Sequence, residues 1–198
     1  MILTLIKYLL LTVSLFGFLP NTFAASEAKN CSVLFTAKNY DAAMPVCTGQ
    51  ANQGNAIAQS YLGYMYQIGG GALQNDKQAV HWFTKAAEQG NAVSQYYLGG
   101  YYRKGEMLPQ DDKQAAYLYA KAAKQGLAIA QSALGLMYYL GTGVLKDIVE
   151  AYAWLNVAAV QGNKFASILR DEFGMEMTPS QLDKAQQLSK TYYKQYVE

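Results

Sequence analysis

The apolar residues between positions 54 and 90 are spaced as on two successive amphipathic helices. Within residues 56–68, and again within 76–88, they recur at steps of three and four, so each set lies on one helix face. These positions are Ala58, Leu62, Met65 and Tyr66 in the first segment, and Ala79, Trp82, Ala86 and Ala87 in the second. We call the first predicted helix "helix A" and the second "helix B".

This pair of helices returns every 36 residues. The segment GNAIAQSYLGYMY at 54–66 reappears as GNAVSQYYLGGYY at 90–102 and as GLAIAQSALGLMY at 126–138, and a degraded copy, GNKFASILRDEF, begins at Gly162. Self-similarity at such a period indicates stacked repeats rather than a single globular core. The sequence therefore predicts an all-α solenoid of antiparallel helix pairs.

Glycine and aspartate residues mark the expected helix ends. Helix A should end at Gly69, Gly105 and Gly141, because glycine adopts the left-handed conformation that terminates many helices. Asp76 and Asp112 are predicted to cap the start of helix B.

A further glycine lies inside helix A of each complete repeat, at Gly63, Gly99 and Gly135. A glycine inside a helix lowers helix stability by about 1 kcal/mol relative to alanine. Its presence at the same helix position in three repeats therefore indicates that close packing requires it. We expect it to let helix B approach closely through small residues at the same level. Those residues are Ala86, Ala122 and Ala158.

The pattern A-x-A-Q-x-x-L-G-x-M-Y-x-x-G-x-G, followed by a helix of the form K-x-A-x-x-W/L-x-x-K-A-A-x-Q-G, resembles the Sel-one-like repeat family. This family is related to the tetratricopeptide repeat, and the resemblance runs from about Asp41 to the C-terminus. It implies a right-handed α-solenoid. It also implies a role in protein–protein interaction rather than catalysis.

Both ends of the array should carry capping helices. Residues 25–53 are expected to form a hairpin, with Cys31 and Cys47 each eight residues from Asn39 and hence both about 12 Å from its turn. This symmetry predicts a disulfide worth about 3 kcal/mol, with two unrelated buried thiols as the alternative. The repeats would then occupy 54–177.

Residues 178–198 are predicted to form the C-terminal helix. Thr178, Pro179 and Gln181 form a capping box with proline at the first helical position. We expect this helix to dock on the last repeat, although a membrane-surface or partner helix is the alternative. The polar Arg170, Asp171 and Glu172 imply that no standard helix B packs behind the degraded copy. The apolar stripe of the last helix consists of Leu182, Ala185, Leu188, Tyr192 and Tyr196.

Residues 1–24 differ in composition from the rest of the chain. Lys7 precedes an apolar run from Tyr8 to Leu19, and the small-residue site ends at Ala24. The run is shorter than the ~20 residues that span a bilayer, so we predict a cleaved signal peptide. An uncleaved anchor is the alternative. Cleavage gives an exported protein with no membrane span, periplasmic or secreted, and we favour the periplasm.

The charge and the cysteine and histidine content argue against several kinds of ligand. The formal net charge is +2 and no Lys/Arg run is present, which argues against nucleic acid. Neither cysteine has another cysteine or a histidine at metal-ligand spacing, so we predict no metal and no cofactor. The single histidine, His81, aligns with Tyr117 of the next repeat and reads as an ordinary surface position.

The enzymatic alternative is a cell-wall or β-lactam hydrolase. Cysteine-rich members of the family have been linked to penicillin binding and β-lactamase activity, but this chain has no cysteine after Cys47. The one S-x-x-K segment is Ser26-Glu27-Ala28-Lys29, and the S-D-N and K-T-G partner motifs are absent. We therefore predict a non-catalytic protein.

The resemblance implies a peptide or protein partner on the concave face, at positions two, five, nine and twelve of helix A. The implied partner belongs to the cell envelope, where relatives restrain kinases or hydrolases or scaffold complexes. Carried over by repeat position, the groove residues are Ile57, Ser60, Tyr64 and Gln67; Val93, Tyr96, Gly100 and Arg103; and Ile129, Ser132, Leu136 and Tyr139. The alternative is that some of these side chains only pack between adjacent A helices.

Overall fold

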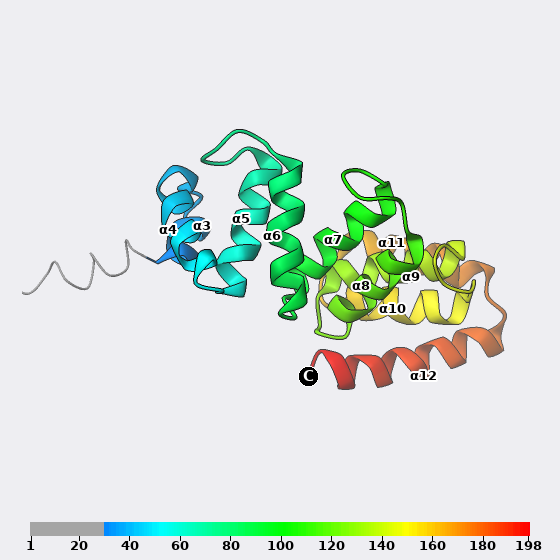
Figure 1. Cartoon of the computed structure of the whole chain (residues 1–198). Helices are drawn as coiled ribbons and strands as arrows, with labels where there is room; N and C mark the ends of the chain where they lie inside the picture. Colours follow the sequence, from blue (N-terminus) through cyan, green and yellow to red (C-terminus); the bar gives the residue numbers. More distant parts are fainter. Residues whose placement is uncertain (1–29) are drawn as a thin grey trace, which may run out of the picture.

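The computed structural model describes residues 30–198, in which every regular element is an α-helix (Figure 1). The predicted signal peptide and its cleavage site lie outside the described residues. The helices are α3 (Cys31–Thr36), α4 (Tyr40–Asn52), α5 (Ala56–Ile68), α6 (Asp76–Glu88), α7 (Ala92–Lys104), α8 (Asp112–Ala123), α9 (Ala128–Leu140), α10 (Ile148–Val160), α11 (Lys164–Glu176) and α12 (Pro179–Tyr196).

The helices stack as consecutive antiparallel pairs along the chain (Figure 1). Helix A of the successive units is α5, α7, α9 and α11, and helix B is α6, α8 and α10. Each of α7, α9 and α11 packs against the preceding helix B, and α7 and α9 also pack against their own. No helix within residues 30–198 combines the length and the hydropathy that crossing a bilayer requires.

The predicted C-terminal ends of helix A are confirmed. Gly69, Gly105 and Gly141 follow α5, α7 and α9 with φ angles of 71°, 72° and 71°, in the left-handed region. The backbone N–H of each glycine bonds a carbonyl of the preceding turn, which satisfies a carbonyl that the helix leaves open.

The predicted caps of helix B were wrong by one residue. Asn75 and Asp111 precede α6 and α8 in extended conformation, and their side chains accept hydrogen bonds from Gln78 N (3.1 Å) and Gln114 N (2.9 Å). Asp76 and Asp112 are the first helical residues instead. The carboxylate of Asp76 does not cap α6. It accepts a hydrogen bond from the Tyr101 hydroxyl at 3.0 Å, which links α6 to α7.

A buried glutamine joins three helices in each of the three complete repeats. Gln95 donates from Nε2 to the Ala87 carbonyl at the end of the preceding helix B, and accepts at Oε1 from Gln125 at the end of its own helix B (2.8 Å). Gln59 and Gln131 make the same pair of bonds. Because these amides are almost completely buried, their hydrogen bonds fix how adjacent repeats stack.

The glycines inside helix A are packing positions, as predicted, but the predicted partners were wrong. A Cβ built on Gly63 would lie 2.6 Å from the Phe83 ring, and one on Gly99 would lie 2.8 Å from the Tyr119 ring. Leu155 occupies the same place opposite Gly135. The glycine thus forms a notch for a large side chain of helix B, three residues before the alanine that we expected there. Residue spacing alone does not fix how two helices are rotated against each other.

The hairpin α3–α4 carries the predicted disulfide. Cys31 and Cys47 are joined, their Cα atoms are 4.8 Å apart, and both side chains are buried. The Phe35 ring of this hairpin stacks on Tyr61 of α5 with ring centres 3.9 Å apart, so the first hairpin packs directly on the first repeat.

At the other end, α12 lies along α10 rather than behind α11 (Figure 1). Tyr192 stacks on Trp154 with ring centres 4.4 Å apart, and its hydroxyl donates to the Glu150 carboxylate at 3.0 Å. The capping box at Thr178 and Gln181 is present as predicted. The last helix therefore docks on helix B of the third repeat, not on the degraded copy.

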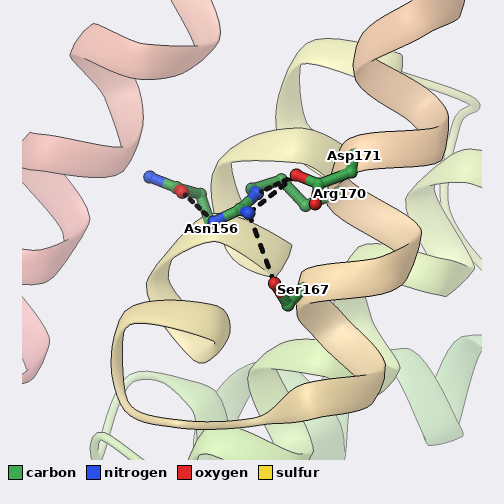
Figure 2. A network of polar contacts seen from close by, with 4 residues as sticks. All are labelled: Asn156, Ser167, Arg170 and Asp171. Carbon is green, nitrogen blue, oxygen red and sulfur yellow. Dashed lines mark hydrogen bonds and ion pairs between the residues drawn. The ribbon is translucent and has the colours of Figure 1, made fainter.

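A polar network accompanies this displacement, and its Asn156 also donates to Ser189 of α12 at 2.9 Å. Arg170 stands where earlier repeats bury Leu62, Leu98 and Leu134, and Figure 2 shows it bonded to three neighbours. It donates to Asn156 Oδ1 of α10 (3.2 Å), to Ser167 Oγ (3.3 Å) and to the Asp171 carboxylate (2.8 Å). Because these groups are polar, this side of α11 has no apolar surface on which a helix B could pack. The sequence prediction that no standard helix B follows the degraded copy agrees with this.

Candidate functional site

Three adjoining hollows lie along the A helices, and we call the surface they form the A-helix groove. The first, of about 380 Å³, lies between α7, α9 and the start of α11; the second, of about 200 Å³, lies along α7; and the third, of about 360 Å³, lies between α3, α5 and α7. The first two share Tyr96, Arg103 and Tyr119, and the last two share Tyr97. The hollows are therefore neighbours along the A helices.

Most residues that the sequence placed on the binding face line this groove. Besides Gly100, they are Ser60, Tyr64, Gln67, Val93, Tyr96, Arg103, Ile129, Ser132 and Leu136. Ser60 and Ser132 are each only 4% exposed, so they add little contact surface. Whether any of these residues touches a partner stays a prediction.

Two predicted residues lie outside the hollows. Ile57 is half exposed at the start of α5. Tyr139 is turned toward the last repeat: its ring stacks on Phe173 at 3.6 Å, and its hydroxyl donates to Glu176 at 2.9 Å. This hydrogen bond raises the pKa of Tyr139. Tyr139 is thus one of the side chains that pack between neighbouring helices, the alternative left open by the sequence.

An exposed apolar row follows the repeat along the A helices. It consists of the second residue of each A helix, at Ile57, Val93, Ile129 and Phe165, and all four side chains are between 42% and 58% exposed. Two members, Ile129 and Phe165, line the first hollow, and Val93 lines the third. An apolar row of this kind, repeated in register, is a typical feature of an interaction surface.

Aromatic rings form the walls of the groove. Tyr96 lies 5.4 Å from Tyr97 and 5.6 Å from Tyr119 between ring centres, and Tyr97 continues to Tyr64 at 5.9 Å. Tyr119 comes from helix B, and it reaches the groove because Gly99 leaves room for its ring. Tyr119 was not predicted from the sequence, because the repeat positions expected on the binding face all belong to helix A.

Arg103 supplies a positive charge at the junction of the first two hollows. Burial raises the pKa of both Tyr96 and Tyr119, and the nearby Arg103 guanidinium partly offsets the increase. Among the described residues, no carboxylate lies within ion-pairing distance of Arg103, whereas Lys104 pairs with Glu106 at 3.5 Å.

The exposed apolar face of α11 was not predicted from the sequence either. Its positions two, five and twelve are Phe165, Ile168 and Met175, which are 58%, 65% and 84% exposed. Applying the 36-residue period to the degraded copy would have identified these three residues, because they lie 36 residues after predicted groove positions of α9. They extend the apolar surface beyond the third repeat.

Groups that could support catalysis are sparse in the described part of the chain. Residues 30–198 contain no group of three or more His, Cys, Asp or Glu side chains placed to hold a metal ion. His81 is exposed on α6, edge-on to Trp82 at 5.1 Å, and it does not line the groove.

Comparison with known proteins agrees with this architecture. The Sel1 repeat family model matches residues 56–91, 92–127 and 128–163, which together are more than half of the chain. These matches coincide with the helix pairs α5–α6, α7–α8 and α9–α10. Sel1 repeat proteins are generally scaffolds for protein–protein interaction. No match was found among curated proteins.

Several solved structures are similar. The protective antigen c5321 of uropathogenic Escherichia coli, which displays an SLR fold, is 34% identical with a TM-score of 0.76 over 86% of this chain, and the chain spans 39% of its length. A Sel1 repeat protein from Oxalobacter formigenes is 36% identical with a TM-score of 0.60, covering 65% of this chain and 97% of that protein. Cysteine-rich protein B of Helicobacter pylori, at 21% identity and a TM-score of 0.53 over 66% of this chain and 94% of its own, shares the fold. The chain belongs to the Sel1 repeat family.

Proposed function

We propose that this protein is a non-catalytic scaffold or adaptor that binds a polypeptide of the cell envelope in the A-helix groove. The succession of three neighbouring hollows carries this proposal, because together they offer an aromatic and apolar surface along successive repeats. Solenoids use extended surfaces of this kind to bind other chains.

The composition of the groove supports a polypeptide ligand. Binding energy in protein interfaces concentrates in a few aromatic and arginine residues that lie near the centre of the contact. Tyr96, Tyr119 and Arg103 lie together where two hollows meet. The tyrosine rings offer large contact area, and their hydroxyls can orient a bound backbone.

An exported, periplasmic location is part of the proposal. The disulfide between Cys31 and Cys47 supports it, because such bonds persist in oxidising compartments. The composition of residues 1–24 supports it as well. The similar protein c5321 is described as a protective antigen.

Truncating the central tyrosine should weaken partner binding. We expect Tyr96→Ala to reduce capture of an envelope partner by more than ~1 kcal/mol, or about fivefold, with the helical circular-dichroism signal unchanged. Purified wild-type and variant proteins would be immobilised, and the envelope proteins each retains would be quantified by mass spectrometry.

Lys85→Ala serves as the control, because Lys85 is exposed on α6 and lines none of the three hollows. The same proteins should be retained by wild type and Lys85→Ala and lost by Tyr96→Ala. Loss with Lys85→Ala and retention with Tyr96→Ala would move the binding surface to the B helices and refute the proposal.

A further inference from the structure

The charged side chains that line the A-helix groove are all cations. Three charged side chains line its hollows, namely Lys38, Arg103 and Lys104, and none of the lining residues is aspartate or glutamate. The carboxylates of α11, Glu172 and Glu176, lie outside the hollows, and Glu176 is occupied by the Tyr139 hydroxyl. Lys104 is paired with Glu106, and Asp76 accepts a hydrogen bond from Tyr101, which lines the second hollow. Arg103 is therefore the cation that the centre of the groove offers to a ligand.

Arg103 is the central cation of this surface, and its environment differs from that of Arg170. Arg170 is bonded to Asn156, Ser167 and Asp171, as Figure 2 shows. Arg103 has no carboxylate partner among residues 30–198 and lies beside the hydroxyl-bearing rings of Tyr96 and Tyr119. Arg103 is exposed, so its guanidinium can make a charge-assisted hydrogen bond with a ligand carboxylate.

Apolar surface flanks Arg103 on both sides along the groove. Toward the C-terminal end, Ile129, Leu136 and Phe165 line the largest hollow. Toward the N-terminal end, Phe35, Tyr61 and Tyr64 line the third hollow. A chain lying along the groove would meet an apolar site, then the cation, then a second apolar site.

We propose that the groove selects a polypeptide segment in which an acidic residue is flanked on both sides by large apolar residues. The acidic side chain binds Arg103, and the apolar side chains occupy the hollows to either side. This inference rests on the proposed function, since it names the chemistry of the partner at the same groove. An aromatic groove also suits proline-rich segments, but these do not use Arg103, which has no carboxylate partner among the described residues.

A random library of 12-residue peptides displayed on phage and panned against the full chain tests the inference. The bound pool should be enriched in aspartate or glutamate with large apolar residues on both sides. For a selected peptide, glutamate-to-glutamine substitution should weaken binding to the wild type about tenfold by calorimetry, and should have little effect on binding to the Arg103→Gln variant. Lys121→Gln, an exposed change on α8, is the matched control and should bind like the wild type.

The outcomes separate this inference from the proposed function. Peptides that lose binding to Tyr96→Ala but show no acidic enrichment, and bind Arg103→Gln normally, would overturn the inference and leave the groove as the binding site. Peptides that are insensitive to both variants, or a library that yields no binder, would overturn both. Proline enrichment without acidic residues would likewise exclude the proposed ligand class.

Discussion

Replacing Gln95 with glutamate should lower the free energy of unfolding by about 3–5 kcal/mol at pH 7, the cost of an uncompensated buried charge. Gln95 is fully buried, and its Nε2 donates to the Ala87 carbonyl at 3.3 Å. An ionised carboxylate cannot donate there, so one of its oxygens would face a carbonyl oxygen without a proton between them. Urea unfolding followed by circular dichroism measures the change.

The loss should depend on pH in a defined direction. Burial would raise the pKa of the introduced glutamate above the ~4.3 of the unfolded chain. The deficit relative to wild type should therefore be small below about pH 4 and grow as the pH rises, because a protonated carboxyl can donate to Ala87 as the amide does. Gln186→Glu, at an exposed site on α12, is the control. Equal unfolding curves for the two variants at pH 7 would show that the buried glutamine does not hold the repeats together.

Replacing Gly99 with leucine should lower the free energy of unfolding by ~1–3 kcal/mol through overpacking. Even a Cβ at this position would lie 2.8 Å from the Tyr119 ring and 3.3 Å from the Ala115 carbonyl oxygen. Thermal and urea unfolding of the two proteins would measure the difference. Since Tyr119 also lines the A-helix groove, the same change should displace a wall of the proposed binding surface.

The adjacent glycine provides a matched control. A Cβ on Gly100 would meet only the Tyr119 hydroxyl, at an ordinary 3.7 Å. Gly100→Ala should therefore stabilise the protein by up to about 1 kcal/mol through helix propensity, whereas Gly99→Ala should fall short of this gain. If both alanine variants are equally stable, Gly99 is not a packing notch.

The sequence predicted the repeat architecture because local signals and periodicity agree. The 36-residue spacing, the left-handed glycines after helix A and the capping box at Thr178 each depend on neighbouring residues in the chain. The error at Asp76 was one residue, which is within the usual uncertainty of a helix start. Local chemistry was therefore sufficient for the helices and their order.

Contacts between helices were harder to predict. Phe83 and Tyr119 fill the glycine notches because of how helix B is rotated against helix A, which spacing does not specify. Tyr139 has the same repeat position as Arg103, yet it stacks on Phe173, because the neighbouring α11 offers an aromatic ring there. The position of α12 involves contacts with α10 that are distant in sequence, such as the hydrogen bond from Asn156 to Ser189.

Site-specific photocrosslinking tests the central claim, that the A-helix groove binds a polypeptide, most directly. The photoreactive residue benzoylphenylalanine would replace Phe165 in the groove or Tyr117 on α8, which are matched in exposure at 58% and 56%. After irradiation of cells that produce each variant, immunoblotting would reveal covalent adducts. The account predicts an adduct of defined mass from position 165 and none from position 117. An adduct from position 117 without one from position 165 would contradict it.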